Sequence, residues 1–215
     1  MTSFAKIAVA ATILGGLAAC GNEGQGVVTQ TVQQIVGERV ARTQAPAQPA
    51  AAARSDAERA AEALRVNAAP LIQVGFEDLG QTQVMAMTGQ NGAMRTYMTP
   101  SEEAVILRGG MLVGTRGLGR DLSVAEPGTE ALIRNGQSGQ GTRVMRYLSG
   151  DGLERPLQFA CTVAPGPQAG LMVESCRGHG TSFQNSYAVQ GGQLPVSRQW
   201  VGPGMGYVTI ATLRP

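Results

Sequence analysis

Two cysteines in the second half of the chain, Cys161 and Cys176, could form a disulfide or act as a reactive thiol pair. They lie 15 positions apart. A reactive pair is usually tuned within a C-x-x-C spacing, which these two residues lack. The choice also depends on the compartment, because disulfides persist in oxidising surroundings. The start of the chain indicates which compartment that is.

The first residues carry the pattern of an export signal. Lys6 supplies a positive charge, and Ile7–Ala19 is an apolar, alanine-rich run. This run is shorter than the about 20 residues that a membrane-spanning helix needs. We therefore interpret residues 1–19 as a cleaved signal peptide. Because an exported protein meets an oxidising compartment, we expect a structural disulfide between Cys161 and Cys176.

The segment Leu17-Ala18-Ala19-Cys20 resembles the lipobox of bacterial lipoproteins. The resemblance implies that Cys20 becomes the first residue of the mature chain and carries acyl chains on its sulfur and nitrogen. Two or more acyl chains give stable membrane anchoring. Gly21 follows in place of an aspartate, which by the same resemblance favours the outer membrane. The alternative is an ordinary cleaved signal peptide followed by an unrelated cysteine.

A second group of chemically capable residues surrounds a Gly-x-Gly turn. Thr115–Leu122 is a strand ending in this turn, where Gly117 and Gly119 permit positive φ. We expect Arg116 and Asp121 to meet across the turn as an ion pair that holds the corner. The alternative is that Arg116 faces a ligand, for instance an acidic sugar.

The only tryptophan, Trp200, follows Arg198 by two positions. An exposed indole beside an arginine would suit stacking on a sugar ring, whereas a buried one would belong to the core. The Gly-Pro-Gly sequence at 202–204 is interpreted as a turn, because a phosphate-binding loop would need a following helix.

Candidates for catalysis are weak. The single histidine, His179, excludes a His-rich metal site, and its place in a glycine-rich turn favours a solvated side chain over a general base. Gly136–Gly139 misses the Gly-x-Ser-x-Gly spacing by one position. Adjacent carboxylates occur at 77/78 and 102/103, but the sequence does not place two of them face to face as a glycosidase requires. We expect no catalytic residue, no metal and no cofactor.

The composition also excludes a nucleic-acid partner. The chain has 215 residues, with 17 basic against 15 acidic side chains and a net charge of +2, and no basic stripe dominates. Apolar residues make up 43%, which is enough for a core, and the 30 glycines suit a chain rich in turns.

Helical spacing of apolar residues predicts an amphipathic helix over 27–42. An Ala/Pro/Gln linker follows over 43–54. Ser55 and Glu58 then form a capping-box pattern that predicts a second helix from Ser55 to about Asn67, ended by Pro70. This alanine-rich helix is expected on the surface of the body.

After Pro70 the repeat of apolar residues changes from about 3.6 residues, as in a helix, to 2 residues, as in a strand. In the first run, Ile72, Val74 and Phe76 share one face, and only Thr129–Arg134 indicates a helical turn. Short runs separated by turn signals predict a mainly all-β, barrel-like antiparallel meander of about ten to eleven strands, preceded by one or two N-terminal helices. The expected strands are 71–77, 82–88, 93–98, 104–108, 111–116, 142–148, 156–164, 171–176, 182–190, 194–201 and 205–213.

We expect this barrel to be soluble. Its strands are shorter than the 9–11 residues of a membrane-spanning strand. Arg143 and Arg146 fall on opposite faces of one strand, so one of them would meet lipid in a membrane barrel.

Several segments in order resemble the YjbF family, also called group 4 capsule lipoproteins. They are Thr115–Leu122, Arg143–Leu148, the Cys161/Cys176 pair, the tail Ser197–Tyr207 and the opening Pro70-Leu71-Ile72. The resemblance implies an outer-membrane lipoprotein with a mostly β, barrel-like domain. Such proteins belong to envelope systems that make or export capsular and exopolysaccharide, usually beside a periplasmic and an outer-membrane partner. The family has no established catalytic residues.

The resulting organisation is a signal peptide over 1–19, a lipid-anchored region with two helices and a linker over 20–69, and the barrel-like domain over 70–215. The first functional hypothesis is a non-enzymatic accessory lipoprotein that faces the periplasm and docks proteins of a polysaccharide system. The second is a carbohydrate-binding module that holds the polymer through Trp200 and arginine side chains such as Arg116 and Arg198. The third is an enzyme acting on glycan.

Overall fold

The computed structural model describes residues 54–148 and 153–215. The predicted signal peptide, Cys20, the helix predicted over 27–42 and the linker up to residue 53 lie outside the described residues. The described chain forms a compact unit that includes the second predicted helix and all of the strands. Within this part of the chain, no helix is long and apolar enough to cross a membrane.

The second predicted helix, α2, spans Asp56–Val66 and begins with the expected capping box. The backbone N–H of Ser55 donates to the Glu58 carboxylate at 2.7 Å, and the Glu58 N–H donates back to the Ser55 hydroxyl at 3.2 Å. Only Ala60 is buried, which confirms a surface helix. Arg214 near the end of the chain donates to the Leu64 carbonyl at 2.8 Å and so holds α2 against the sheet.

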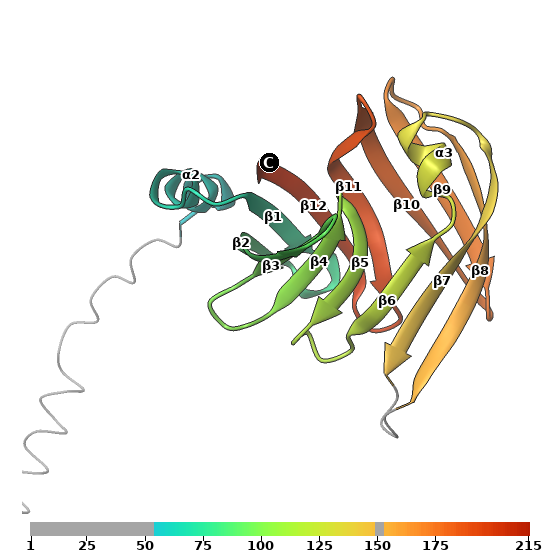
Figure 1. The fold of residues 1–215 in the computed structure, drawn as a ribbon, viewed down its shortest axis with the longest axis horizontal. Helices are drawn as coiled ribbons and strands as arrows, with labels where there is room; N and C mark the ends of the chain where they lie inside the picture. The colour runs from blue at the N-terminus through green and yellow to red at the C-terminus, as the bar shows by residue number, and fades with distance from the viewer. Residues whose placement is uncertain (1–53, 149–152) are drawn as a thin grey trace, which may run out of the picture. The chain divides into compact units, whose positions relative to one another are not determined.

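Twelve antiparallel strands form one curled sheet (Figure 1). A 3₁₀ turn, η1 (Glu77–Leu79), follows the first strand, and one short helix, α3 (Glu130–Arg134), follows the sixth. The strands are β1 (Leu71–Phe76), β2 (Gln81–Asn91), β3 (Met94–Met98), β4 (Ala104–Arg108), β5 (Met111–Arg116), β6 (Leu122–Pro127), β7 (Gly139–Leu148), β8 (Glu154–Pro165), β9 (Leu171–Gly178), β10 (Thr181–Gln190), β11 (Gln193–Gly202) and β12 (Gly206–Arg214).

The sheet is a meander that nearly closes on itself. Its order is β5-β4-β3-β2-β1-β12-β11-β10-β9-β8-β7-β6. Strands that are consecutive in sequence therefore pair with each other, except β5 and β6, and β1 also pairs with β12. The two ends of the sheet, β5 and β6, come together again and pack without a hydrogen-bonded ladder. We call the line between them the seam. The predicted barrel-like meander is confirmed, with β6 as an additional strand.

The core fills the interior of the curled sheet. Ile72, Val74 and Phe76 on β1 point inward, as their alternation predicts, and are buried. The middle of the core holds three aromatic side chains, Phe159, Phe183 and Trp200. The Trp200 and Phe183 rings stack with their centroids 4.3 Å apart.

The helix α3 confirms the helical turn predicted over 129–134 and contributes to a second apolar cluster. Its Ile133 is fully buried among side chains that include Met111 and Tyr187. Arg134 fixes the helix by donating to the carbonyls of Gly192 at 2.9 Å and Arg108 at 3.0 Å. These bonds join α3 to the turns that precede β5 and β11.

Candidate functional site

The turn between β5 and β6 is built around the carboxylate of Asp121. This carboxylate accepts hydrogen bonds from the backbone N–H groups of Gly117 at 2.9 Å and Leu118 at 3.1 Å, and from the Thr115 hydroxyl at 3.0 Å. Gly117 and Gly119 both take positive φ, +76° and +89°, as the sequence predicts. Asp121 therefore holds the corner by satisfying backbone donors within the turn.

Arg116 does not pair with Asp121, so the predicted ion pair is wrong. Its guanidinium points across the seam and donates to the carbonyls of Leu122 at 3.2 Å and Ser123 at 3.4 Å. The Thr115 hydroxyl also bridges the strands, accepting from the Leu122 N–H at 2.9 Å. Arg116 therefore supplies side-chain hydrogen bonds where a backbone ladder is missing, and this geometry supports the structural interpretation of that residue.

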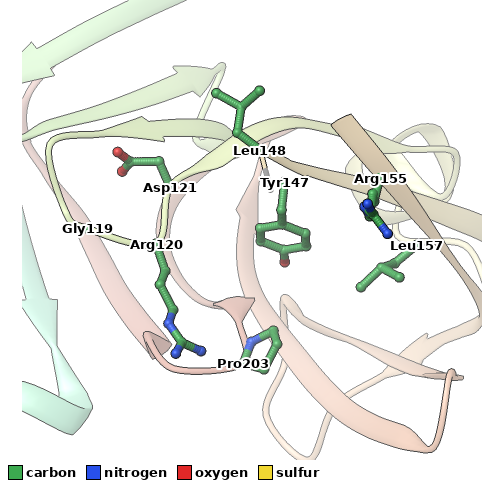
Figure 2. Close-up of a pocket in the computed structure, with 8 residues that line it drawn as sticks. All are labelled: Gly119, Arg120, Asp121, Tyr147, Leu148, Arg155, Leu157 and Pro203. Atoms are coloured by element: carbon green, nitrogen blue, oxygen red, sulfur yellow. The ribbon is translucent and has the colours of Figure 1, made fainter. Parts of the chain in front are cut away.

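A pocket of about 480 Å³ lies beside this turn, which we call the Arg120 pocket (Figure 2). Two turns and two strand ends at one end of the barrel form it: the β5–β6 turn, the adjoining ends of β7 and β8, and the β11–β12 turn. Its volume falls in the range of sites for small ligands, about 300–1,000 Å³. The lining residues are Gly119, Arg120, Asp121, Tyr147, Leu148, Arg155, Leu157 and Pro203.

Arg120 is an exposed cation at the wall of this pocket. Figure 2 shows its guanidinium directed toward Pro203, while the carboxylate of Asp121 points the other way. A Cβ at Gly204 would come within 3.0 Å of the Arg120 Cδ, so the stem of Arg120 lies directly over that glycine. In the part of the chain that the structure describes, Arg120 makes no hydrogen bond or ion pair.

Tyr147 forms an apolar wall between Arg120 and Arg155 in Figure 2. Its hydroxyl donates to the Val201 carbonyl at 2.6 Å. Burial raises the pKa of the Tyr147 phenol well above its ordinary value, and the charge of Arg143 only partly offsets this effect. The phenol therefore stays protonated and anchors β7 to β11.

The described lining residues do not provide the groups for glycoside hydrolysis. Among them, Asp121 is the one carboxylate, and that carboxylate is already bonded to the turn. Glycosidases use two carboxylates, one of them free to donate a proton. The pocket offers a cation beside apolar surface, which suits binding of an anion.

Trp200 does not face solvent. Only 8% of its surface is exposed, and it packs between the Phe183 face and the Phe159 edge. It is also not among the described residues that line the Arg120 pocket. The core interpretation is therefore correct, and stacking of Trp200 on a sugar ring is excluded by its burial.

Arg198 lies on the outer surface in an ion pair with Glu77, with 2.7 Å between Nη2 and Oε2. Its guanidinium also covers the ring of Tyr207, 3.5 Å from the centroid. The hydrogen bonds from Arg198 hold the pKa of Glu77 below its usual value despite partial burial. These contacts join β11, β12 and the start of η1, and they give Arg198 a structural role.

Cys161 and Cys176 form the expected disulfide, directly opposite each other on β8 and β9. Both cysteines are buried, and Glu174 lies close to them. These three residues do not make a metal site, because the sulfurs are bonded to each other and Glu174 binds Arg143.

The lone histidine, His179, accepts a hydrogen bond from the Gln158 N–H at 3.2 Å, which gives it a structural partner.

Two features were not predicted from the sequence. One is the Arg120 pocket, which needs two distant turns and the ends of β7 and β8 to be brought together. The other is a buried ion pair between Arg143 on β7 and Glu174 on β9, two strands that are separated by β8 in the sheet. The predicted placement of Arg143 and Arg146 on opposite faces is correct, since Arg146 lies outside and pairs with Glu126.

Comparisons with known proteins agree with this architecture. The crystal structure of the hypothetical lipoprotein YmcC from Escherichia coli K12 is similar, with a TM-score of 0.57, 18% identity, and coverage of 90% of this chain and 98% of that chain. At this identity the similarity shows the fold alone. No curated protein sequence matches the chain significantly.

The sequence model of one family, described as "Group 4 capsule polysaccharide lipoprotein gfcB, YjbF", matches residues 29–213. This match covers most of the chain, including every strand except the last residue of β12. The chain therefore belongs to the YjbF family of capsule polysaccharide lipoproteins.

Proposed function

We propose that this protein is a non-enzymatic accessory component of capsule or exopolysaccharide production or export. It is anchored in the outer membrane through acyl chains on Cys20, faces the periplasm, and docks periplasmic and outer-membrane proteins of the same system. Membership of a capsule lipoprotein family supports this role.

The observation that carries the docking role is a pair of exposed leucines at one end of the barrel. Leu148 at the end of β7 is 63% exposed, and Leu153 just before β8 is 62% exposed. Leu148 also lines the Arg120 pocket. A contiguous exposed apolar patch rimmed by polar residues marks a protein interaction site, and we take these two leucines as the apolar part of such a patch. The carboxylate of Asp121 is occupied by backbone donors of its own turn, which supports a role without catalysis.

Co-purification from envelopes tests the docking role. The full-length chain is captured from detergent-solubilised envelopes as wild type and as the Leu148→Ser/Leu153→Ser variant. The matched control is Leu79→Ser/Val196→Ser, which removes two other exposed apolar side chains. Leu79 on η1 is 55% exposed, and Val196 on β11 is 45% exposed. We expect the first variant alone to lose its specific envelope protein and to lower the amount of surface polysaccharide. Equal retention by all three chains would contradict the proposal.

A second candidate function, direct holding of the polysaccharide, is favoured by the Arg120 pocket. Neither Trp200 nor Arg198 supports that role, because one is buried and the other is paired with Glu77. Arg120, by contrast, has no polar partner among the described residues and lies beside apolar surface. Retention of purified protein on the immobilised polysaccharide alone would distinguish this function from protein docking.

A further inference from the structure

We infer that the Arg120 pocket binds an acidic sugar residue, with the Arg120 guanidinium holding the carboxylate and the apolar walls contacting the sugar ring. This inference rests on the second candidate function and names the ligand class of its site. It is carried by the chemistry of the pocket walls and by how they are positioned.

The first step is the charge of Arg120. The neighbouring carboxylate, Asp121, could neutralise it, but Asp121 is directed into the turn and bonded to the N–H groups of Gly117 and Leu118. In the residues that the structure describes, Arg120 donates to no acceptor. The planar guanidinium can grip a carboxylate through two parallel hydrogen bonds, which gives both affinity and orientation.

The second step is the positioning of Arg120. Its stem crosses the β11–β12 turn over Gly204, where a Cβ would approach the Arg120 Cδ to 3.0 Å and Nη1 to 3.1 Å. The turn at its own base is fixed by Asp121. A side chain that is already placed loses less conformational entropy when a ligand binds.

The third step is the apolar surface next to this cation. Leu157, Pro203 and the ring of Tyr147 line the same pocket, and the Tyr147 hydroxyl is occupied by the Val201 carbonyl. Tyr147 therefore offers its ring to the pocket. Sugar rings have faces made of C–H groups that pack on apolar and aromatic side chains, whereas inorganic phosphate has no such face. The guanidinium beside apolar walls therefore favours a ligand that carries both an anionic group and an apolar ring face.

The fourth step is access for a polymer. The described lining residues come from two turns and from the ends of β7 and β8 at the same end of the barrel, and Arg120 itself is exposed. One residue of a long chain can therefore enter the pocket from the end of the barrel while its neighbours stay outside.

Calorimetry with the full-length chain in detergent tests the inference. The probes are oligogalacturonate, a neutral malto-oligosaccharide of the same length, inorganic phosphate, and soluble glycerol phosphate as the lipid-headgroup anion. We expect binding of oligogalacturonate only. Arg120→Gln should weaken it by about tenfold or more, because a charge-assisted hydrogen bond is lost. Arg120→Lys keeps the positive charge but lacks the planar guanidinium. Its affinity for oligogalacturonate should therefore lie between that of wild type and that of Arg120→Gln.

The matched control is Arg177→Gln. Arg177 is an exposed arginine on β9, has no polar partner in the described structure, and lies outside the Arg120 pocket. This variant changes the net charge equally and should bind oligogalacturonate as wild type does. An unchanged affinity of Arg120→Gln, equal binding of the neutral sugar, or binding of phosphate or glycerol phosphate in place of oligogalacturonate would overturn the inference. Glycan binding that is independent of Arg120 would leave the second candidate function intact, whereas absence of all glycan binding would contradict both.

Discussion

Arg143 and Glu174 form an ion pair inside the curled sheet, with 2.8 Å between Nη2 of Arg143 and Oε2 of Glu174. Their side chains are 2% and 0% exposed. The same Arg143 nitrogen donates to the Tyr187 hydroxyl at 2.9 Å, and the Asn185 amide donates to Glu174 at 2.8 Å. Thr129, just before α3, also donates to Glu174. The network therefore joins β7, β9, β10 and the start of α3.

Removing one partner of this pair should be costly. Arg143→Met leaves the Glu174 carboxylate buried without its counter-charge, and the expected loss is about 3–5 kcal/mol of unfolding free energy. The double variant Arg143→Met/Glu174→Met removes both charges and should recover part of that loss. Urea unfolding of wild type, Arg143→Met, Glu174→Met and the double variant measures the coupling. A single variant that costs less than about 1 kcal/mol would show that the pair is not desolvated as the structure indicates.

The same pair predicts a dependence of stability on pH. Burial alone would raise the pKa of Glu174, but the charge of Arg143 and the hydrogen bonds from Arg143, Thr129 and Asn185 outweigh it and lower the pKa below 4.5. The ionised form is therefore favoured in the folded state. Its contribution to stability is fully present above the unfolded pKa and is lost as the pH falls through the folded pKa.

Glu174→Gln cannot titrate, so its unfolding free energy should fall less steeply than that of wild type on acidification below about pH 5. At neutral pH the variant should already be less stable, because Arg143 keeps its charge without a carboxylate. Thermal unfolding in a series of buffers measures both effects. If the unfolding free energy of the two chains fell equally steeply with decreasing pH, the lowered pKa of Glu174 would be contradicted.

The disulfide should contribute to stability without contributing to function. The loop that it closes spans 15 positions, for which the chain-entropy model gives about 3 kcal/mol. Cys161→Ser/Cys176→Ser should therefore unfold at lower urea concentration, and a reductant should move wild type to the same midpoint. The reductant should not affect the double variant. A reductant that abolished ligand or partner binding while leaving the fold intact would instead indicate a functional thiol pair.

The strands could be predicted where large apolar residues alternate, as at Ile72, Val74 and Phe76. The strand β6 was missed because its pattern is weak. Its Ala125 is buried while Val124 is exposed, and a register shift interrupts the pairing with β7 between Leu122 and Val124. Pro127 at its end is tolerated because β6 is an edge strand. Hydropathy alone does not reveal such a strand.

The site was less predictable because it depends on which strands become neighbours. The partners Arg143 and Glu174 are 31 positions apart and meet only because β7, β8 and β9 fold as a meander. For Asp121 a local signal was available: short acidic side chains near glycine turns commonly accept hydrogen bonds from nearby backbone N–H groups. Opposite charge was the wrong criterion for choosing the partner of Arg116. At the seam its guanidinium donates to the backbone carbonyls of Leu122 and Ser123 and not to the Asp121 carboxylate.

The seam itself predicts a role for Arg116 in stability. Arg116→Met keeps most of the side-chain stem but removes the donors to the Leu122 and Ser123 carbonyls, and the expected loss is about 1–3 kcal/mol. Arg177→Met is the matched control and should leave the urea midpoint unchanged. In Arg116→Met, amide hydrogen exchange should become faster than in wild type at β5 and β6, whereas exchange at β9 and β10 should change less. Equal midpoints for the two variants would show that Arg116 does not hold the seam.

Membrane anchoring through Cys20 remains a prediction, since that residue lies outside the described structure. Cys20→Ser removes the thiol that would form the thioether to diacylglycerol, so the variant should incorporate no labelled palmitate. Cys161→Ser should be labelled as wild type is, because its thiol belongs to the buried disulfide. Separation of inner and outer membranes should place the labelled chains in the outer membrane. Equal labelling of Cys20→Ser and wild type, or a mature chain that starts at another residue, would contradict the anchor.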